Sequence, residues 1–261
     1  MSVATTAQRA SSWTAASSLA WRIGSIALLL AVWQIVAAVI HSRLLPSAST
    51  VLVALAQECV HGPLLFNLGI TLARVAAAFA IAMVVGTAIG IVMGRSRTID
   101  ALFDSWLVLL LNLPALVIIV LAYVWFGLTE AAAIGAVAVN KIPNTAVTLR
   151  EGARALERRY ADMAASFHIG RWRTLRHVIM PQLYPYIFAA ARSGLALVWK
   201  IVLIVELLGR SNGVGFEIQL YFQQFDVTRI LAYSIAFMVV MQLIEWAVFQ
   251  PLERRASAWR Q

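Results

Sequence analysis

The sequence is short of charge and of cysteine. Only 13% of its 261 residues are Asp, Glu, Lys or Arg, whereas soluble domains carry about 25%. Hydrophobic residues make up 61%, so the polar side chains are too few to cover a soluble globule of this length. A single cysteine, Cys59, excludes an intrachain disulfide and a multi-cysteine metal site. The composition therefore indicates a protein whose main solvent is lipid.

Signatures of catalysis are also missing. The sequence has no G-x-x-x-x-G-K-[ST] phosphate loop, so the chain is not expected to be an ATPase itself. His168 and His177 are nine residues apart, out of register on a helix, and no cysteine lies near them. A membrane-embedded hydrolase is an alternative, but no Ser/His/Asp set or acidic pair has suitable spacing. We therefore expect no catalytic residue, no metal and no cofactor on this chain.

Apolar segments long enough to cross about 30 Å of hydrocarbon recur along the chain. They predict an all-α, polytopic membrane protein with six spans, at residues 22–41, 71–94, 105–128, 131–149, 186–208 and 230–250. The first apolar run is longer than the roughly 7–15 residues of a cleaved signal peptide, so we interpret it as an uncleaved span. Pro114 predicts a kink in the third span. The fourth is the least apolar because it contains Asn140, Lys141 and Pro143.

The basic residues predict the orientation. The net charge of +9 could suggest nucleic acid as a partner, but no solvated basic domain exists to bind it. About two-thirds of the 21 Lys and Arg residues instead fall on one side of the six-span topology. Because cytoplasmic segments carry the excess of Lys and Arg, both tails, residues 1–20 and 255–261, are predicted to be cytoplasmic. The transmembrane domain then extends over residues 21–254.

The second span carries a regular row of glycines. Gly86, Gly90 and Gly94 recur every four residues, which puts them on one face of a helix. Small residues allow helix backbones to approach closely in lipid. We therefore predict that this face is a packing seam; the alternative is that glycine is merely tolerated in membrane helices.

One long polar segment, the loop at residues 150–185, interrupts the apolar runs. Seven arginines lie between Arg150 and Arg176, and Phe167, Trp172 and Leu175 stand among them as apolar anchors. Such a pattern is typical of a basic amphipathic helix on anionic lipid headgroups. It equally suits a helix that inserts into a groove on another protein. The residues alone leave both interpretations open.

Within this loop the sequence resembles the membrane permease subunits of bacterial ABC importers. Their cytoplasmic loop has the form E-A-A-x-x-x-G, nine residues, then I-x-L-P. The positions that take part in the alignment are Asp162, Met163, Ala164, His168, Val178, Met180 and Pro181. His168 stands where the family has glycine, and Gly170 follows two residues later. This departure predicts a differently shaped turn.

The resemblance covers about residues 45 to 255 and points to the subgroup for nitrate, sulfonates, taurine and related small anions. The residues that carry it outside the loop are Leu45–Ser47, Arg74, Phe79, the three glycines, Trp125–Gly127, Glu130, Gly152, Glu206–Gly209 and Asn212–Gly215. It implies a bacterial inner-membrane protein that pairs with a second permease subunit, most simply a second copy. It also implies a cytoplasmic ATPase dimer that binds ATP and Mg, and an extracytoplasmic solute-binding protein.

The family mechanism implies that the loop docks on the ATPase. The docking residues would be Asp162, Ala164, Phe167, His168, Gly170, Trp172, Leu175 and Pro181. Two further classes stay open: a stand-alone secondary transporter, although we find no internal repeat of the kind these show, and a structural membrane scaffold.

Charged groups inside spans are costly and usually face a cavity or a partner. Lys141, Lys200 and Glu206 are therefore candidates for the translocation path, and basic side chains there would suit an anionic solute. Glu206 lies six residues after Lys200, so the two do not stack on one helix face. Pairing of Lys200 elsewhere in the protein remains the alternative.

Overall fold

The computed structural model describes residues 21, 24–42, 44–156, 163, 166, 168, 170–249 and 251. In this part of the chain every regular element is a helix, and no strand occurs. After a first helix at Gly24–Ile40, the elements are α2 (Ala48–Val60), α3 (Leu64–Arg95), α4 (Arg97–Asn112), α5 (Ala115–Phe126), α6 (Glu130–Arg154), α8 (Arg171–Thr174), the π-helix η1 (Leu175–Ile179), α9 (Met180–Gly209), α10 (Val214–Gln223), α11 (Val227–Ile244) and the π-helix η2 (Glu245–Phe249).

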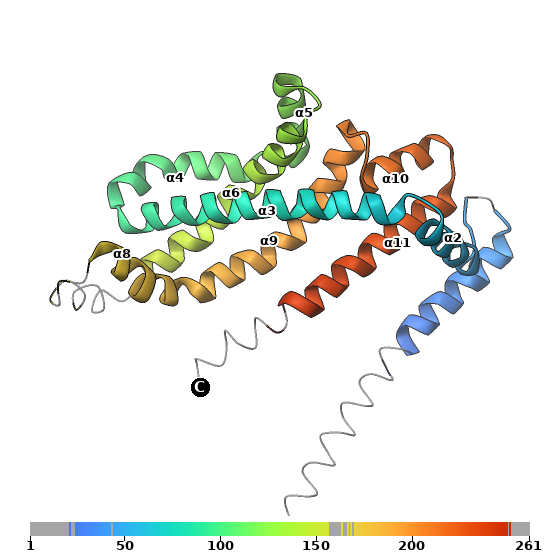
Figure 1. The fold of residues 1–261 in the computed structure, drawn as a ribbon, viewed down its shortest axis with the longest axis horizontal. Helices are drawn as coiled ribbons and strands as arrows, with labels where there is room; N and C mark the ends of the chain where they lie inside the picture. Colours follow the sequence, from blue (N-terminus) through green and yellow to red (C-terminus); the bar gives the residue numbers. More distant parts are fainter. Residues whose placement is uncertain are drawn as a thin grey trace, which may run out of the picture.

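The long helices α3, α6 and α9 form the centre of the molecule (Figure 1). Their contact is lined by small side chains such as Ala78, Ala133 and Ala136, each at most 3% exposed. Val198 and Val202 of α9 fill the space beside them. α11 joins this core through Phe237, whose ring centre is 5.6 Å from that of Trp199 on α9. The core therefore depends on close helix approach more than on large side chains.

The three glycines of the predicted seam all face α6. A Cβ atom built on Gly86 would lie 2.6 Å from the Thr145 side chain, and one on Gly90 would lie 2.5 Å from the Ala146 carbonyl oxygen. A Cβ on Gly94 would lie 2.6 Å from Ala153. These distances leave no room for a side chain, so the glycines allow α3 and α6 to pack backbone against side chain.

The predicted third span is broken rather than kinked. The chain bends by 96° between α4 and α5, and Leu113 and Pro114 at the break are extended, with ψ values of 125° and 133°. Proline disfavours helical geometry in the residue before it, which explains why α4 stops at Asn112. Figure 1 shows the result: α4 folds back along α3, whereas α5 stands away from the body.

By length and apolarity, three described helices can cross a membrane: Leu64–Arg95, Trp172–Gly209 and Val227–Ala247. The broken pair α4 and α5 would make a fourth. α6 is not among them, since Asn140, Lys141 and Pro143 lower its hydropathy. Gly24–Ile40 is apolar but shorter than the other three. The all-α membrane fold is confirmed, and the count of six spans stays a prediction.

Candidate functional site

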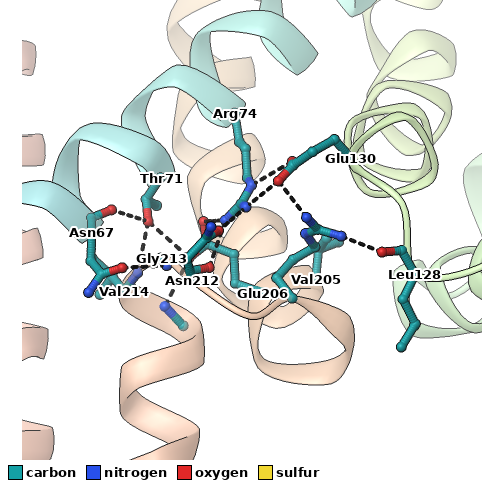
Figure 2. Close-up of polar contacts among 12 residues, drawn as sticks. Asn67, Thr71, Arg74, Leu128, Glu130, Val205, Glu206, Asn212, Gly213 and Val214 are labelled. Atoms are coloured by element: carbon teal, nitrogen blue, oxygen red, sulfur yellow. Dashed lines mark hydrogen bonds and ion pairs between the residues drawn. The ribbon is translucent and has the colours of Figure 1, made fainter.

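Arg74 is the centre of a buried polar cluster at the end of the bundle where α3 begins and α9 ends (Figure 2). Its guanidinium group donates to Glu206 Oε1 of α9 at 2.7 Å and to both carboxylate oxygens of Glu130 at the start of α6, at 2.6 and 2.9 Å. It also donates to the carbonyl oxygen of Asn212 at 2.9 Å and to its Oδ1. One side chain thus joins three helices and the turn between α9 and α10.

The carboxylate of Glu206 is fully buried, at 0% exposure. Besides Arg74, it accepts from the Thr71 hydroxyl and from the Gly215 backbone N–H, both at 2.9 Å. Each oxygen is therefore satisfied, and burial of this charge is compensated by a paired cation and hydrogen bonds. We name the cluster of Thr71, Arg74, Glu130, Glu206 and the 212–215 turn the outer clamp, after the side of the membrane on which the predicted topology puts it.

The turn between α9 and α10 is built around the Glu206 carboxylate. Gly213 has a φ of +105°, and a Cβ atom on it would lie 2.5 Å from the carboxylate. The Gly213 N–H donates to Asn67 Oδ1 at 2.7 Å, and the Val214 N–H donates to the Thr71 hydroxyl at 2.9 Å. Only glycine meets both the conformation and the space required here, which explains the N-G-V-G sequence after α9.

Glu130 also binds a second arginine. Arg210, just after α9, donates to Glu130 Oε1 at 2.5 Å and also to the Leu128 carbonyl oxygen. Hydrogen bonds from Arg74, reinforced by the positive charges of Arg74 and Arg210, lower the pKa of Glu130 to about 2, although partial burial opposes this shift. Glu130 is therefore ionised throughout the physiological range and connects α6 to the end of α9.

The three predicted path residues have different surroundings. Glu206 belongs to the outer clamp. Lys141 is 2% exposed, and its side chain occupies the space left by Gly194, where a Cβ atom would lie 2.4 Å from Lys141 Cε. Lys200, by contrast, is exposed on α9. The structure therefore does not bring these three residues together, and their roles in a path stay predictions.

A second ionic cluster lies at the opposite end of the bundle. Arg150 Nη1 lies 3.3 Å from Asp100 and also pairs with Asp104, so α6 is tied to α4. Arg154 pairs with Asp100 and, at 2.9 Å, with Glu151. Two of the seven arginines of the polar segment thus hold helices of this chain together.

Of the predicted docking residues, Asp162, Ala164 and Phe167 lie outside the described residues. Trp172 is 72% exposed, whereas Leu175 is half-buried against a small core that includes Leu149 and Ile179. Pro181 lies in the first turn of α9, directly after η1, so the continuous helical unit lacks one backbone N–H donor at this position.

His168, at the position of the family glycine, has a φ of +52°. This left-handed conformation is uncommon for residues other than glycine, although histidine is among those that adopt it more often. Gly170, by contrast, is not among the residues with positive φ. The backbone at His168 thus has the conformation that a glycine would favour, although the side chain differs.

The sequence does not predict the outer clamp as a unit, although two of its charged residues can be identified in the predicted spans. Arg74 lies inside the predicted second span and Glu206 inside the fifth, and opposite charges buried in spans tend to pair. That rule could have proposed Arg74 as the partner of Glu206. The six-residue spacing argued against a pair of Lys200 and Glu206 within one helix, but no local pattern pointed to Arg74, because the two paired residues are 132 residues apart.

The long apolar helices, with buried charges paired inside them, define a polytopic membrane protein rather than a soluble one. The family described as "binding-protein-dependent transport system inner membrane component" matches residues 82–250. The chain belongs to this family and is a multi-pass permease of the inner membrane.

Curated relatives are similar over most of their length. The chain is 28% identical to the putative aliphatic sulfonates transport permease protein SsuC of Bacillus subtilis, with 90% of this chain and 85% of that protein covered. It is 27% identical to the taurine transport system permease protein TauC of Escherichia coli, with 95% and 92% covered. A bicarbonate transport system permease protein, CmpB of Synechococcus elongatus, is 28% identical over 62% of this chain and 58% of that protein.

A solved structure has the same fold. It is described as the crystal structure of an amino acid ABC transporter with histidines, and the similarity has a TM-score of 0.59 at 23% identity. It covers 77% of this chain and 97% of that chain. At this identity the similarity establishes the architecture alone.

Proposed function

We propose that the chain is the permease subunit of an ATP-driven ABC importer in the bacterial cytoplasmic membrane. It has six spans within residues 21–254, and both termini are cytoplasmic. Together with a second permease subunit, as a homodimer, it forms the path for a small anionic solute. ATP and Mg are bound by a separate ATPase dimer, and a soluble binding protein delivers the solute from outside.

The observation that carries this proposal is the continuity between the polar segment and a membrane span. Trp172–Gly209 is one helical unit of 38 residues, which includes α8, η1 and α9. A helix of this length has a fixed rise of about 1.5 Å per residue. No loop interrupts this unit between Trp172 and the outer clamp, so a movement at Trp172 reaches α9 through continuous helix, with η1 as the place where that helix can bend.

The surface of the polar segment suits docking on a protein. Trp172 is 72% exposed, and large aromatic side chains of this kind commonly anchor interfaces. Leu175, one turn later, is half-buried against the same chain. The exposed indole on a supported helix favours insertion into a groove of the ATPase over loose contact with lipid headgroups.

A second permease subunit is supported by the surfaces that this protomer leaves open. The helix Gly24–Ile40 exposes apolar side chains on most sides, with Leu29 at 68% and Val39 at 73% exposure. α5 likewise exposes Val124 and Trp125. Lipid could cover such surfaces, but a broken span that stands away from its own body is better supported by a neighbouring subunit.

The solute class follows from the relatives. Their names refer to aliphatic sulfonates, taurine and bicarbonate, which share a compact anionic group. We infer that this chain conducts a solute of the same class.

The test is co-purification of the tagged chain with the ATPase encoded beside it. Wild type and Trp172→Phe should retain the ATPase, whereas Trp172→Asp should lose at least 10-fold, and Phe167→Asp should add to the loss. If wild type purifies alone in mild detergent and still catalyses uptake without ATP, the importer proposal fails and a secondary transporter replaces it.

A further inference from the structure

We propose that Lys200 binds the anionic group of the solute inside the membrane. The proposal rests on the permease function above and assigns the residue that contacts the cargo.

α9 has one exposed face, and Lys200 lies in the middle of it. Ser193, Leu197, Lys200, Ile204 and Leu208 are all exposed and follow each other at helical spacing. The opposite face is buried in the core through Val198, Ile201, Val202 and Val205. The exposed face therefore contacts something outside this protomer, which is lipid, another subunit or an aqueous path.

The depth of Lys200 argues against lipid. In the predicted fifth span it lies nine residues before Gly209, the last residue of α9, which is about 13.5 Å of helix at about 1.5 Å per residue. A four-carbon lysine side chain does not reach the interface over that distance, so snorkelling does not relieve the cost of its charge. The face that carries Lys200 consequently points toward water or protein.

Lys200 has no ion-pair partner among the described residues. Its ammonium group lies 5.4 Å from the centre of the neighbouring Trp199 ring, a contact that leaves hydrogen-bond donors free. Glu206 is already bound to Arg74 at 2.7 Å. Glu245, the other acidic residue within the predicted spans, lies 3.2 Å from Arg192.

A second copy of the chain does not supply a counter-ion either. Glu206 and Glu245 are the only acidic residues within the six predicted spans. Both are used within their own protomer, by Arg74 and by Arg192. In a homodimer the remaining source of negative charge at this depth is the solute itself. Because Lys141 is enclosed against Gly194 at 2% exposure, Lys200 is the accessible cation.

The first experiment measures the local charge and needs no solute. In a Cys59→Ser background, Leu197→Cys places a thiol one turn from Lys200, and Leu197 is 43% exposed. The assembled complex is treated with an anionic or a cationic methanethiosulfonate reagent, with Lys200 present or replaced by Met. We expect the anionic reagent to react at least 3-fold faster, and this preference to disappear in Lys200→Met. No reaction at Leu197→Cys, or an unchanged preference, overturns the proposal.

Ile81→Cys is the matched control. Arg74 of α3 and Glu206 of α9 are paired, so they lie at the same depth. Ile81 lies seven residues after Arg74 on α3, and Lys200 lies six residues before Glu206 on α9. Both positions are therefore at a similar distance from the outer clamp. Ile81 is 44% exposed but apolar. We expect its thiol to react at least 10-fold more slowly than Leu197→Cys with both reagents, and equal rates would show that depth alone, rather than an aqueous path, decides access.

The second experiment measures uptake by the reconstituted complex with taurine, ethanesulfonate and bicarbonate as probes. Lys200→Met should lower uptake at least 10-fold and Lys200→Arg less than 3-fold, while both still co-purify with the ATPase. Wild-type uptake by Lys200→Met overturns the proposal. If wild type transports no probe and does not hold the ATPase, the permease proposal has failed, whereas the reagent preference still decides the assignment of Lys200.

Discussion

Removal of Arg74 should be among the most damaging single changes in this chain. In Arg74→Met, Glu206 stays at 0% exposure and loses its only cation, while Glu130 keeps Arg210 at 2.5 Å. Loss of one partner from a buried ion pair costs about 3–5 kcal/mol, because the other charge stays buried without compensation. For a protein of this size that corresponds to roughly 10 °C in melting temperature.

Substitution of Glu206 should cost less stability than substitution of Arg74. Glu206→Gln removes the charge but keeps a side-chain oxygen that accepts from Thr71 or Gly215, and Arg74 retains Glu130. We expect a loss of about 1–2 kcal/mol. The double variant Arg74→Met, Glu206→Met should be more stable than Arg74→Met alone, since it leaves no unpaired charge on α9.

The measurement is the melting temperature of the detergent-solubilised chain, determined from the size-exclusion peak that remains after heating at increasing temperatures. Arg154→Ala is the control, since Arg154 is 43% exposed and Asp100 retains Arg150. Such an exposed pair contributes at most about 1 kcal/mol. Equal melting temperatures for Arg74→Met and Arg154→Ala would refute the view that the outer clamp stabilises the fold.

Three further changes test other parts of the structure. Gly90→Leu should destabilise the fold by about 1–3 kcal/mol because it forces a side chain onto the Ala146 carbonyl oxygen. Gly69→Ala on the same helix meets open space and should be neutral or stabilising. Both effects are measured by the melting temperature. With a pKa of about 2 in the folded protein and 4.5 ordinarily, Glu130 contributes stability above pH 4.5 that is lost as the pH falls toward 2, so Glu130→Gln should flatten acid denaturation in that window. His168→Gly should retain the co-purified ATPase and His168→Val should lose it, since a β-branched residue disfavours a φ of +52°.

The sequence predicts much of the fold because lipid imposes a simple rule on composition. Long apolar runs of the sequence overlap α3, α9 and α11, and the row of glycines lies on the face of α3 that meets α6. Composition predicts the helices less well where polar residues interrupt an apolar run. α6 is continuous over 25 residues despite Pro143, whereas Pro114 separates two helices. Proline alone does not decide between these outcomes, because the contacts of the surrounding helices do.

The polar interactions were harder to predict, because they depend on contacts between distant segments. The six-residue spacing of Lys200 and Glu206 argued against a pair within one helix, and the structure places one on the exposed face of α9 and the other in the core. That Glu206 binds Arg74, and that the turn at Gly213 folds around its carboxylate, depends on the way α3 and α9 meet. No local sequence pattern specifies how these two helices pack.

The positions of these features along α9 limit how the protein can move. At one end Glu206 fixes α9 to α3 through Arg74, and at the other the helix continues through η1 to the exposed Trp172. A π-helical turn is a frequent site of bending, and η1 lies between Trp172 and the span. If the ATPase moves Trp172, the displacement either bends η1 or rotates α3, α6 and α9 as one body. The satisfied hydrogen bonds of the outer clamp and the glycine seam oppose any sliding among those three helices. In the proposed homodimer, rotation as one body would turn the Lys200 face relative to the second subunit, and this movement would open and close the proposed path between the two subunits.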